Sequence, residues 1–134
     1  MFLDTSGLLC YLYANEPQYR KAVRLFKNAR GKLITHAQVL SELIVLASVR
    51  RFPRTKAISL TIDLINSPDV EIVWVNEPLH NEAIQLLIQR PDKDYSLCDA
   101  ISFVLMKQRN ISEALTTDRH FEQENFVRLL PPIT

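Results

Sequence analysis

Short apolar runs alternate with longer amphipathic stretches along the whole chain, a pattern typical of strands that alternate with helices. Residues 1–4 are interpreted as a short buried strand that continues into a helix. The pattern predicts further strands over residues 32–36, 70–76, 113–117 and 127–130, and further helices over residues 5–13, 17–30, 37–51, 55–66, 78–90 and 96–110. Strands joined by helices imply a parallel sheet covered on both faces. We therefore expect an α/β fold of three layers, α/β/α, around a mainly parallel sheet of roughly five strands.

The composition favours a single domain without linkers. Of the 134 residues, 47% are hydrophobic, which is enough for one core. The chain has only two glycines and no low-complexity stretch, so residues 1–134 are expected to form one domain. No apolar run approaches the roughly 18 residues of a membrane span, and no basic leader is present, which predicts a soluble cytoplasmic protein. Cys10 and Cys98 are too few and too far apart for a disulfide framework or a zinc knuckle, so both are expected to be free thiols.

Residues 55–66 form a predicted helix that is apolar almost all round. Such a helix is either central in the fold or covered by a partner. This pattern indicates a homodimer.

The charges are unevenly distributed, although the net charge is only +1. Residues 20–56 hold ten of the sixteen Lys and Arg against one acid, whereas the chain from residue 57 onward holds twelve acids and six bases. This asymmetry can mark a face that binds a polyanion, and the alternative is that the bases lie on ordinary solvated helix faces. The candidate residues are Arg20, Lys21, Arg24, Lys27, Arg30, Arg50, Arg51 and Arg54.

Four acids stand at positions where α/β proteins place their sites. Asp4 and Asp118 follow predicted strands, and in parallel sheets ligands collect at the carboxyl ends of the strands. Asp99 lies at the start of a predicted helix, on the side that faces inward. Glu42 interrupts an otherwise apolar face formed by Val39, Val45, Leu46 and Val49.

Each of these acids also has a structural explanation. Asp4 and Asp118 are each suited to cap a following helix, and Asp99 has the spacing of a capping box with Ser96. Glu42 can form a salt bridge with one of the many arginines of the basic half. The signal is their joint placement, because converging carboxylates repel one another unless a cation neutralises them. Oxygen ligands without His or Cys favour Mg²⁺ or Mn²⁺ over zinc, and we expect ordinary structural roles for His36, His80 and His120.

The sequence resembles PIN-domain ribonucleases, in particular the VapC-type toxins of bacterial and archaeal toxin–antitoxin pairs. The resemblance covers nearly the whole chain. It rests on FLDTSGLL at the start, SEL at 41–43, DYSLCDAISFVLM at 94–106 and ALTTDRHF at 114–121. Cys98 departs from the family pattern, where Thr is common, and Asn125 stands where a Gly before Phe is common. Neither departure removes an acid.

The resemblance implies a PIN-like fold and an endoribonuclease that uses Mg²⁺, with Mn²⁺ possible. It implies that Asp4, Glu42, Asp99 and Asp118 bind the metal, with Thr5, Ser6 and Thr117 as polar supports and Asp94 as an auxiliary acid. It also implies hydrolysis by water, which leaves 5′-phosphate and 3′-hydroxyl ends, and an antitoxin partner that covers the site. The basic residues, above all Arg20, Lys21, Arg24, Lys27, Arg50 and Arg51, are then candidates to hold the RNA backbone.

A non-catalytic RNA-binding or assembly module with the same fold is the alternative function, and a complete set of four acids argues against it, because clustered carboxylates repel phosphate. Other phosphate-handling α/β enzymes fit the sequence less well. A haloacid-dehalogenase-like phosphatase needs a second Asp where Ser6 stands, and a response-regulator receiver needs an acidic pair near the end of the first strand. The chain also lacks a glycine-rich phosphate loop.

Overall fold

The computed structural model describes residues 1–133 and confirms the α/β class. Five strands form one sheet in the order β3-β2-β1-β4-β5, and every pairing is parallel. The strands are β1 (Phe2–Leu3), β2 (Leu33–His36), β3 (Val70–Val73), β4 (Glu113–Leu115) and β5 (Val127–Arg128). Because β1 is the central strand, the residue that follows it lies between the ends of two neighbouring strands.

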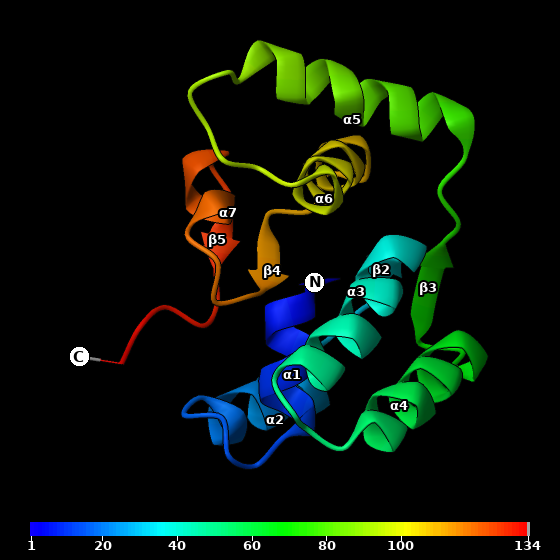
Figure 1. The fold of residues 1–134 in the computed structure, drawn as a ribbon, viewed down its shortest axis with the longest axis vertical. Helices are drawn as coiled ribbons and strands as arrows, with labels where there is room; N and C mark the ends of the chain where they lie inside the picture. The colour runs from blue at the N-terminus through cyan, green and yellow to red at the C-terminus, as the bar shows by residue number, and fades with distance from the viewer. Residues whose placement is uncertain (134) are drawn as a thin grey trace.

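The helices lie on both faces of the sheet, as a three-layer fold requires. They are α1 (Thr5–Leu12), α2 (Tyr19–Asn28), α3 (Ala37–Val49), α4 (Arg54–Asn66), α5 (Glu77–Gln89), α6 (Leu97–Gln108) and α7 (His120–Gln123). The chain crosses the sheet in one direction from β1 to β3 and in the other from β3 to β5. Since such crossovers are right-handed, α1 to α4 cover one face and α5 to α7 the other. Figure 1 shows α5 and α6 together above the strands and α1, α2 and α4 below them. Over residues 1–133, none of these helices combines the length and the apolarity needed to cross a membrane.

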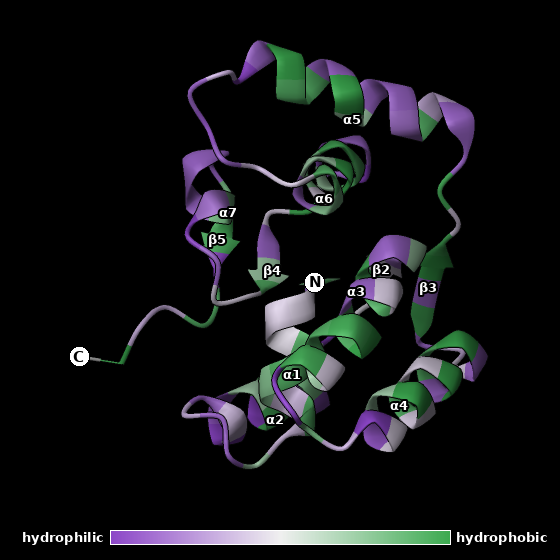
Figure 2. Ribbon diagram, viewed as in Figure 1, coloured by the Kyte–Doolittle hydropathy of each residue, from purple (hydrophilic) through white to green (hydrophobic). Residues whose placement is uncertain are grey.

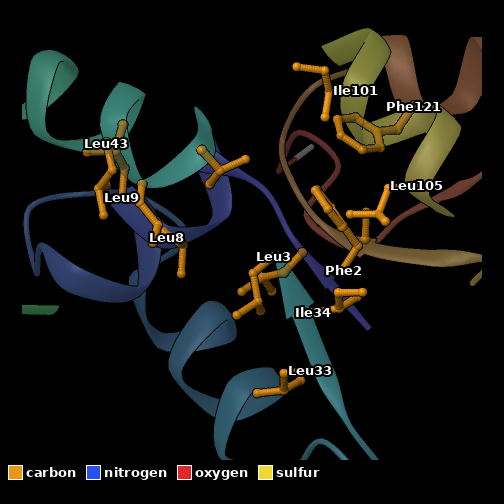
Figure 3. Close-up of a cluster of buried hydrophobic side chains, with 14 of the residues drawn as sticks. Phe2, Leu3, Leu8, Leu9, Leu33, Ile34, Leu43, Ile101, Leu105 and Phe121 are labelled. Carbon is orange, nitrogen blue, oxygen red and sulfur yellow. The ribbon is translucent and has the colours of Figure 1, made fainter. Parts of the chain in front are cut away.

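The two residues of β1 serve the two layers of the core. Phe2 and Leu3 are both fully buried, and successive strand residues point to opposite faces of a sheet. The Phe2 ring lies 6.2 Å from the ring of Phe121 in α7, measured between centroids. Figure 3 shows Phe2 on the side of Phe121 and Leu105, and Leu3 on the side of Leu8. The strand that carries the site is therefore fixed by packing on both faces.

Several expected elements are shorter in the structure, and the strands expected over residues 113–117 and 127–130 end at Leu115 and Arg128. The helix expected over residues 17–30 begins only at Tyr19 and ends at Asn28. The run over residues 70–76 predicts a buried strand, but β3 ends at Val73, lies at an edge of the sheet and is mostly half-buried. The side chain of Trp74, just beyond β3, is 63% exposed. The apolar run does not reveal whether its strand has one neighbour or two.

Helix α4, expected to be central or covered, is buried on only one face in this chain. Ile62 and Ile65 are 53% and 43% exposed, and Val45 and Val49 of α3 are 56% and 71% exposed. Figure 2 shows α3 with long hydrophobic stretches, whereas α4 and α5 both alternate between hydrophilic and hydrophobic turns. The homodimer predicted from this helix thus stays a prediction, with these four side chains as its candidate surface.

Candidate metal centre and active site

Asp4 lies at the carboxyl end of β1 and is 5% exposed. It occupies the N-cap position of α1, but its side chain makes no capping hydrogen bond. Instead, its Oδ2 accepts hydrogen bonds from the hydroxyls of Thr116, at 2.7 Å, and Ser6, at 3.1 Å. The capping explanation for Asp4 is therefore wrong, and its carboxylate is held by the end of β4 and the first turn of α1.

A glycine sets the close approach of α1 to β4. A Cβ atom added at Gly7 would stand 1.9 Å from the carbonyl oxygen of Leu115, far inside van der Waals contact. This approach lets Ser6 Oγ accept a hydrogen bond from the backbone N–H of Thr117, at 3.0 Å. The hydroxyl of Thr5 is buried and has no hydrogen-bond partner among the described residues. The DTSG motif thus packs the start of α1 against the strand that leads to Asp118.

Asp99, Asp118 and His120 form a compact group beside Asp4. One ligand atom of each residue lies within 4.8 Å of the corresponding atoms of the other two. Asp99 makes the capping box expected from the sequence, with its Oδ2 accepting from the backbone N–H of Ser96 at 3.2 Å. Asp118 Oδ1 accepts from the backbone N–H of His120 at 2.9 Å, where α7 begins. Asp99 therefore has the capping role considered for it, whereas the N-cap of α7 is Arg119 and Asp118 only bonds to the first residue of that helix. Both acids still face a common space.

Glu42 lies on α3 and is linked to the group through Cys98. Its side chain is half-buried, as expected, and it belongs to no ion pair among residues 1–133. It lies beside Cys98 of α6, whose pKa is raised by burial first and then by the negative charges of Glu42, Asp4 and Asp99. The thiol of Cys98 thus lies among three of the four acids. Both cysteines are free, as predicted.

The electrostatics of the site are those of acids that are buried together. Burial raises the pKa of Asp4 to about 7, the negative charges of Asp99 and Asp118 raise it too, and the hydrogen bonds from Thr116 and Ser6 oppose the rise. The pKa of Asp99 is likewise raised, by burial first and by Asp118 second. Such a group is stable in its ionised form only with a counter-ion. The oxygen-rich donor set and the unpartnered Thr5 hydroxyl fit a divalent cation.

Asp94 is the proposed site acid with no observed link to this group. It is exposed in the loop before α6, and it makes no hydrogen bond or ion pair with any described residue. Its auxiliary role therefore rests on the resemblance alone.

The basic residues do not gather around the acids. Gln18, just before α2, donates hydrogen bonds to the carbonyls of Leu130 and Pro131 beyond β5, so α2 begins at the carboxyl edge of the sheet. Farther along α2, Lys27 lines a cavity with Val70, the first residue of β3. α2 therefore runs from the edge of the site to the opposite edge. Only its first turn, with Arg20 and Lys21, is placed near the carboxyl ends of the strands. Arg24 shares a cavity with Met1 and Glu113 at the amino edge.

The other bases of the candidate set lie on exposed surface. Arg50 forms an ion pair with Glu16 at 2.8 Å and lies over the ring of Phe52. Arg51 follows it in a left-handed backbone conformation with φ 59°.

Sequence reasoning missed two residues of the site, Thr116 and His120. Thr116 bonds to Asp4, whereas its neighbour Thr117 was named as the support. Strand alternation gave no signal, because Ala114 and Leu115 are both core residues and each shares its side with one of the two threonines. The parallel register of Phe2 with Ala114 is what places Thr116 beside Asp4. The Nδ1 of His120 lies 3.3 Å from Asp99 Oδ2 and 3.4 Å from Asp118 Oδ1. For His120, the signal was its spacing of two residues from Asp118.

His36 has the structural role expected for it. Its Nδ1 accepts the backbone N–H of Val39 at 3.4 Å, which caps α3, and its Nε2 lies 2.9 Å from Ser102 Oγ in α6. Burial lowers the pKa of this imidazole to about 4, so it is neutral at pH 7. His36 thereby ties the helix that carries Glu42 to the helix that carries Asp99.

Comparisons with known proteins agree with this architecture. The family model described as the PIN domain matches residues 1–126. The 23S rRNA-specific endonuclease VapC20 of Mycobacterium tuberculosis is 28% identical over 131 residues, which cover 98% of each chain. The crystal structure of that VapC20, described as a sarcin-ricin loop cleaving toxin, superposes with a TM-score of 0.86 and covers 94% of this chain and 95% of the other.

Proposed function

This chain belongs to the PIN domain family, and on that basis we propose that it is a divalent-metal-dependent endoribonuclease, the toxin of a type II toxin–antitoxin pair. The observation that carries the proposal is the group of Asp4, Asp99 and Asp118, two of which have raised pKa values because they are buried close to one another. A non-catalytic RNA-binding module is disfavoured by the same group. Its negative charge repels a phosphate backbone unless a cation intervenes.

The four acids have distinct positions around the proposed metal site. Asp4 is the most buried and is fixed by two hydroxyls, so it serves as the rigid ligand. Asp99 and Asp118 stand at the starts of α6 and α7, and Glu42 closes the group from α3. A divalent ion there, Mg²⁺ or Mn²⁺, supplies Lewis acidity to a phosphate oxygen and lowers the pKa of the attacking water. Hydrolysis by water leaves a 5′-phosphate and a 3′-hydroxyl.

The substrate is proposed to be RNA, and the relative directs the choice of the first RNA to test. Because the similar VapC20 is described as cleaving the sarcin-ricin loop of 23S rRNA, ribosomes and an isolated sarcin-ricin hairpin are the first substrates. We further propose that the protein acts in the cytoplasm, that an antitoxin covers the site, and that the exposed side chains on α3 and α4 join two copies. Size-exclusion chromatography with light scattering of Val49→Asp tests the last point.

The direct test is cleavage of labelled RNA with and without Mg²⁺ by the natural chain, Asp4→Asn and Asp99→Asn. Each of these variants is expected to lose at least about 100-fold in rate, because each removes a charged metal ligand. Asp92→Asn is the matched control, since Asp92 is an exposed aspartate with only Lys93 as its ion-pair partner. Circular dichroism establishes that each variant is folded. Equal rates for Asp4→Asn and the control would refute the site.

Asp94→Asn belongs in the same series. Full activity of that variant would remove Asp94 from the machinery and leave the other four acids in place. Mapping the ends of the products distinguishes attack by water from attack by the 2′-hydroxyl. A 2′,3′-cyclic phosphate would contradict the proposed chemistry.

A further inference from the structure

His120 stands where a metal ligand stands, between two of the acids. Its Nδ1 is 3.3 Å from Asp99 Oδ2 and 3.4 Å from Asp118 Oδ1. Neighbouring ligands around a cation with bonds of about 2.1 Å are separated by roughly 3 to 4 Å. The imidazole nitrogen therefore has ligand spacing from each carboxylate, and the ligand atoms of all three residues lie within 4.8 Å of one another. The contact of Nδ1 with Asp99 is also a hydrogen bond, so a bound cation would take the place of the shared proton.

The ring of His120 is held in this position by its surroundings. The edge of the Tyr95 ring packs against it, with centroids 5.2 Å apart and planes at 66°. Tyr95 is in turn fixed through its hydroxyl, which donates to Glu124 at 2.9 Å. Glu124 is buried and also accepts hydrogen bonds from Arg90 and Lys107. A ligand supported by a second layer of packed and hydrogen-bonded groups is oriented before the metal arrives.

A nitrogen ligand changes which metal the site prefers. Carboxylate oxygens suit both Mg²⁺ and Mn²⁺, whereas imidazole suits transition metals and is a poor ligand for Mg²⁺. We propose that Nδ1 of His120 is a ligand of the metal site, beside Asp99 and Asp118, and that it gives this enzyme a preference for Mn²⁺ over Mg²⁺. This inference rests on the proposed function only in assuming that the acids bind a divalent ion.

The experiment measures metal binding to the whole chain without RNA. Calorimetric titration gives the affinities for Mn²⁺ and Mg²⁺ of the natural chain and of His120→Gln. The variant is expected to bind Mn²⁺ at least about tenfold more weakly, while its Mg²⁺ affinity stays within about threefold, so the preference for Mn²⁺ collapses. An equal loss for both metals would mean that His120 only orients the carboxylates, and no loss for either would remove it from the site.

Electron spin-echo spectroscopy of the Mn²⁺ complex gives a second, independent signal. Modulation from the ¹⁴N nuclei of an imidazole is expected in the natural chain and in His80→Gln, whose histidine is exposed on α5. The modulation should be lost in His120→Gln. If that variant does not fold, the spectrum of the natural chain still decides, because a Mn²⁺ complex without ¹⁴N coupling overturns the proposal. A nitrogen-coupled Mn²⁺ complex that cleaves no RNA would instead refute the proposed function alone.

Discussion

Thr116 joins two acids of the site through one hydroxyl group. Its Oγ1 donates a 2.7 Å hydrogen bond to Asp4 Oδ2 and accepts one of 3.0 Å from the backbone N–H of Asp118. The bond to Asp4 favours the ionised carboxylate and opposes the rise of its pKa. The end of β4 therefore sets both the charge of Asp4 and the path of the chain toward Asp118.

Replacing that hydroxyl with a methyl group is expected to weaken the site without changing its shape. In Thr116→Val the pKa of Asp4 should rise further above its usual range, so the rising limb of the pH–rate profile should move to higher pH. The buried donor and acceptor left without partners should cost about 1–3 kcal/mol of stability. Thr117→Val is the control, because the Thr117 hydroxyl makes no hydrogen bond among the described residues. Identical pH profiles for the two variants would contradict the role of Thr116.

Because Asp4 is buried, we also predict how the stability of the metal-free protein depends on pH. The pKa of Asp4 is raised from 3.8 to about 7 in the folded chain, so the folded state binds its proton more tightly than the unfolded state does. This contribution to stability is fully present below about pH 4 and is lost as the pH rises through 7. The loss corresponds to about 4 kcal/mol once Asp4 is ionised.

The measurement is urea unfolding in EDTA from pH 4 to 8, for the natural chain and for Asp4→Asn. His36 acts in the opposite direction, because its pKa is lowered from 6.5 to about 4, so its contribution to stability is lost as the pH falls from about 6.5 to about 4. The difference between the two proteins isolates Asp4. Saturating Mg²⁺ should recover most of the loss at pH 8 in the natural chain and little in the variant. If the stability of both proteins changes with pH in the same way in EDTA, ionisation of Asp4 does not destabilise the fold.

The order of the elements and the acids was predictable because both depend on local pattern. The five strands and the long helices follow from apolar periodicity, and Asp4 and Asp118 were identified by their position after strands. The packing between elements was not predictable in the same way. The 1.9 Å clearance at Gly7 depends on where α1 meets β4, and the contact of His120 with Asp99 joins residues from two helices. Each distance depends on how two separate segments pack, so it cannot be derived from either segment alone.

The positions of the basic residues in the fold could not be predicted from one segment of sequence either. Residues 20–56 are basic as a segment, but α2 spans the depth of the sheet and carries its charges from one edge to the other. Asn125 shows the reverse case, where structure explains a departure from the family pattern. Its φ of 69° lies in the left-handed region that Gly adopts freely and Asn tolerates better than most residues.

Gly7 is expected to be the less replaceable of the two glycines. In Gly7→Ala the methyl group would overlap the carbonyl of Leu115, so α1 must move away from β4. We expect a loss of about 1–3 kcal/mol or more, together with weaker metal binding, because Ser6 and Asp4 move with the helix. Gly31→Asn is the matched control, since Gly31 has φ 78° and nothing within 4 Å of its added Cβ. Equal melting temperatures for Gly7→Ala and Gly31→Asn would contradict this packing argument.

The direction of α2 gives a prediction that separates its two ends. If RNA lies across the carboxyl edge of the sheet, Arg20 contacts its backbone, whereas Lys27 at the amino edge does not. Charge reversal in Arg20→Glu should then weaken RNA binding and reduce the slope of log K against log salt by about one or two ions.

Lys27→Glu makes the same change in net charge on the same helix, so long-range effects are matched, and its slope should stay near that of the natural chain. Binding is measured by fluorescence anisotropy over a salt series from roughly 50 to 200 mM, with Asp99→Asn as the background to prevent cleavage. Equal slopes for the two reversals would mean that the first turn of α2 has no special contact, and a larger effect at Lys27 would place the RNA on the opposite edge.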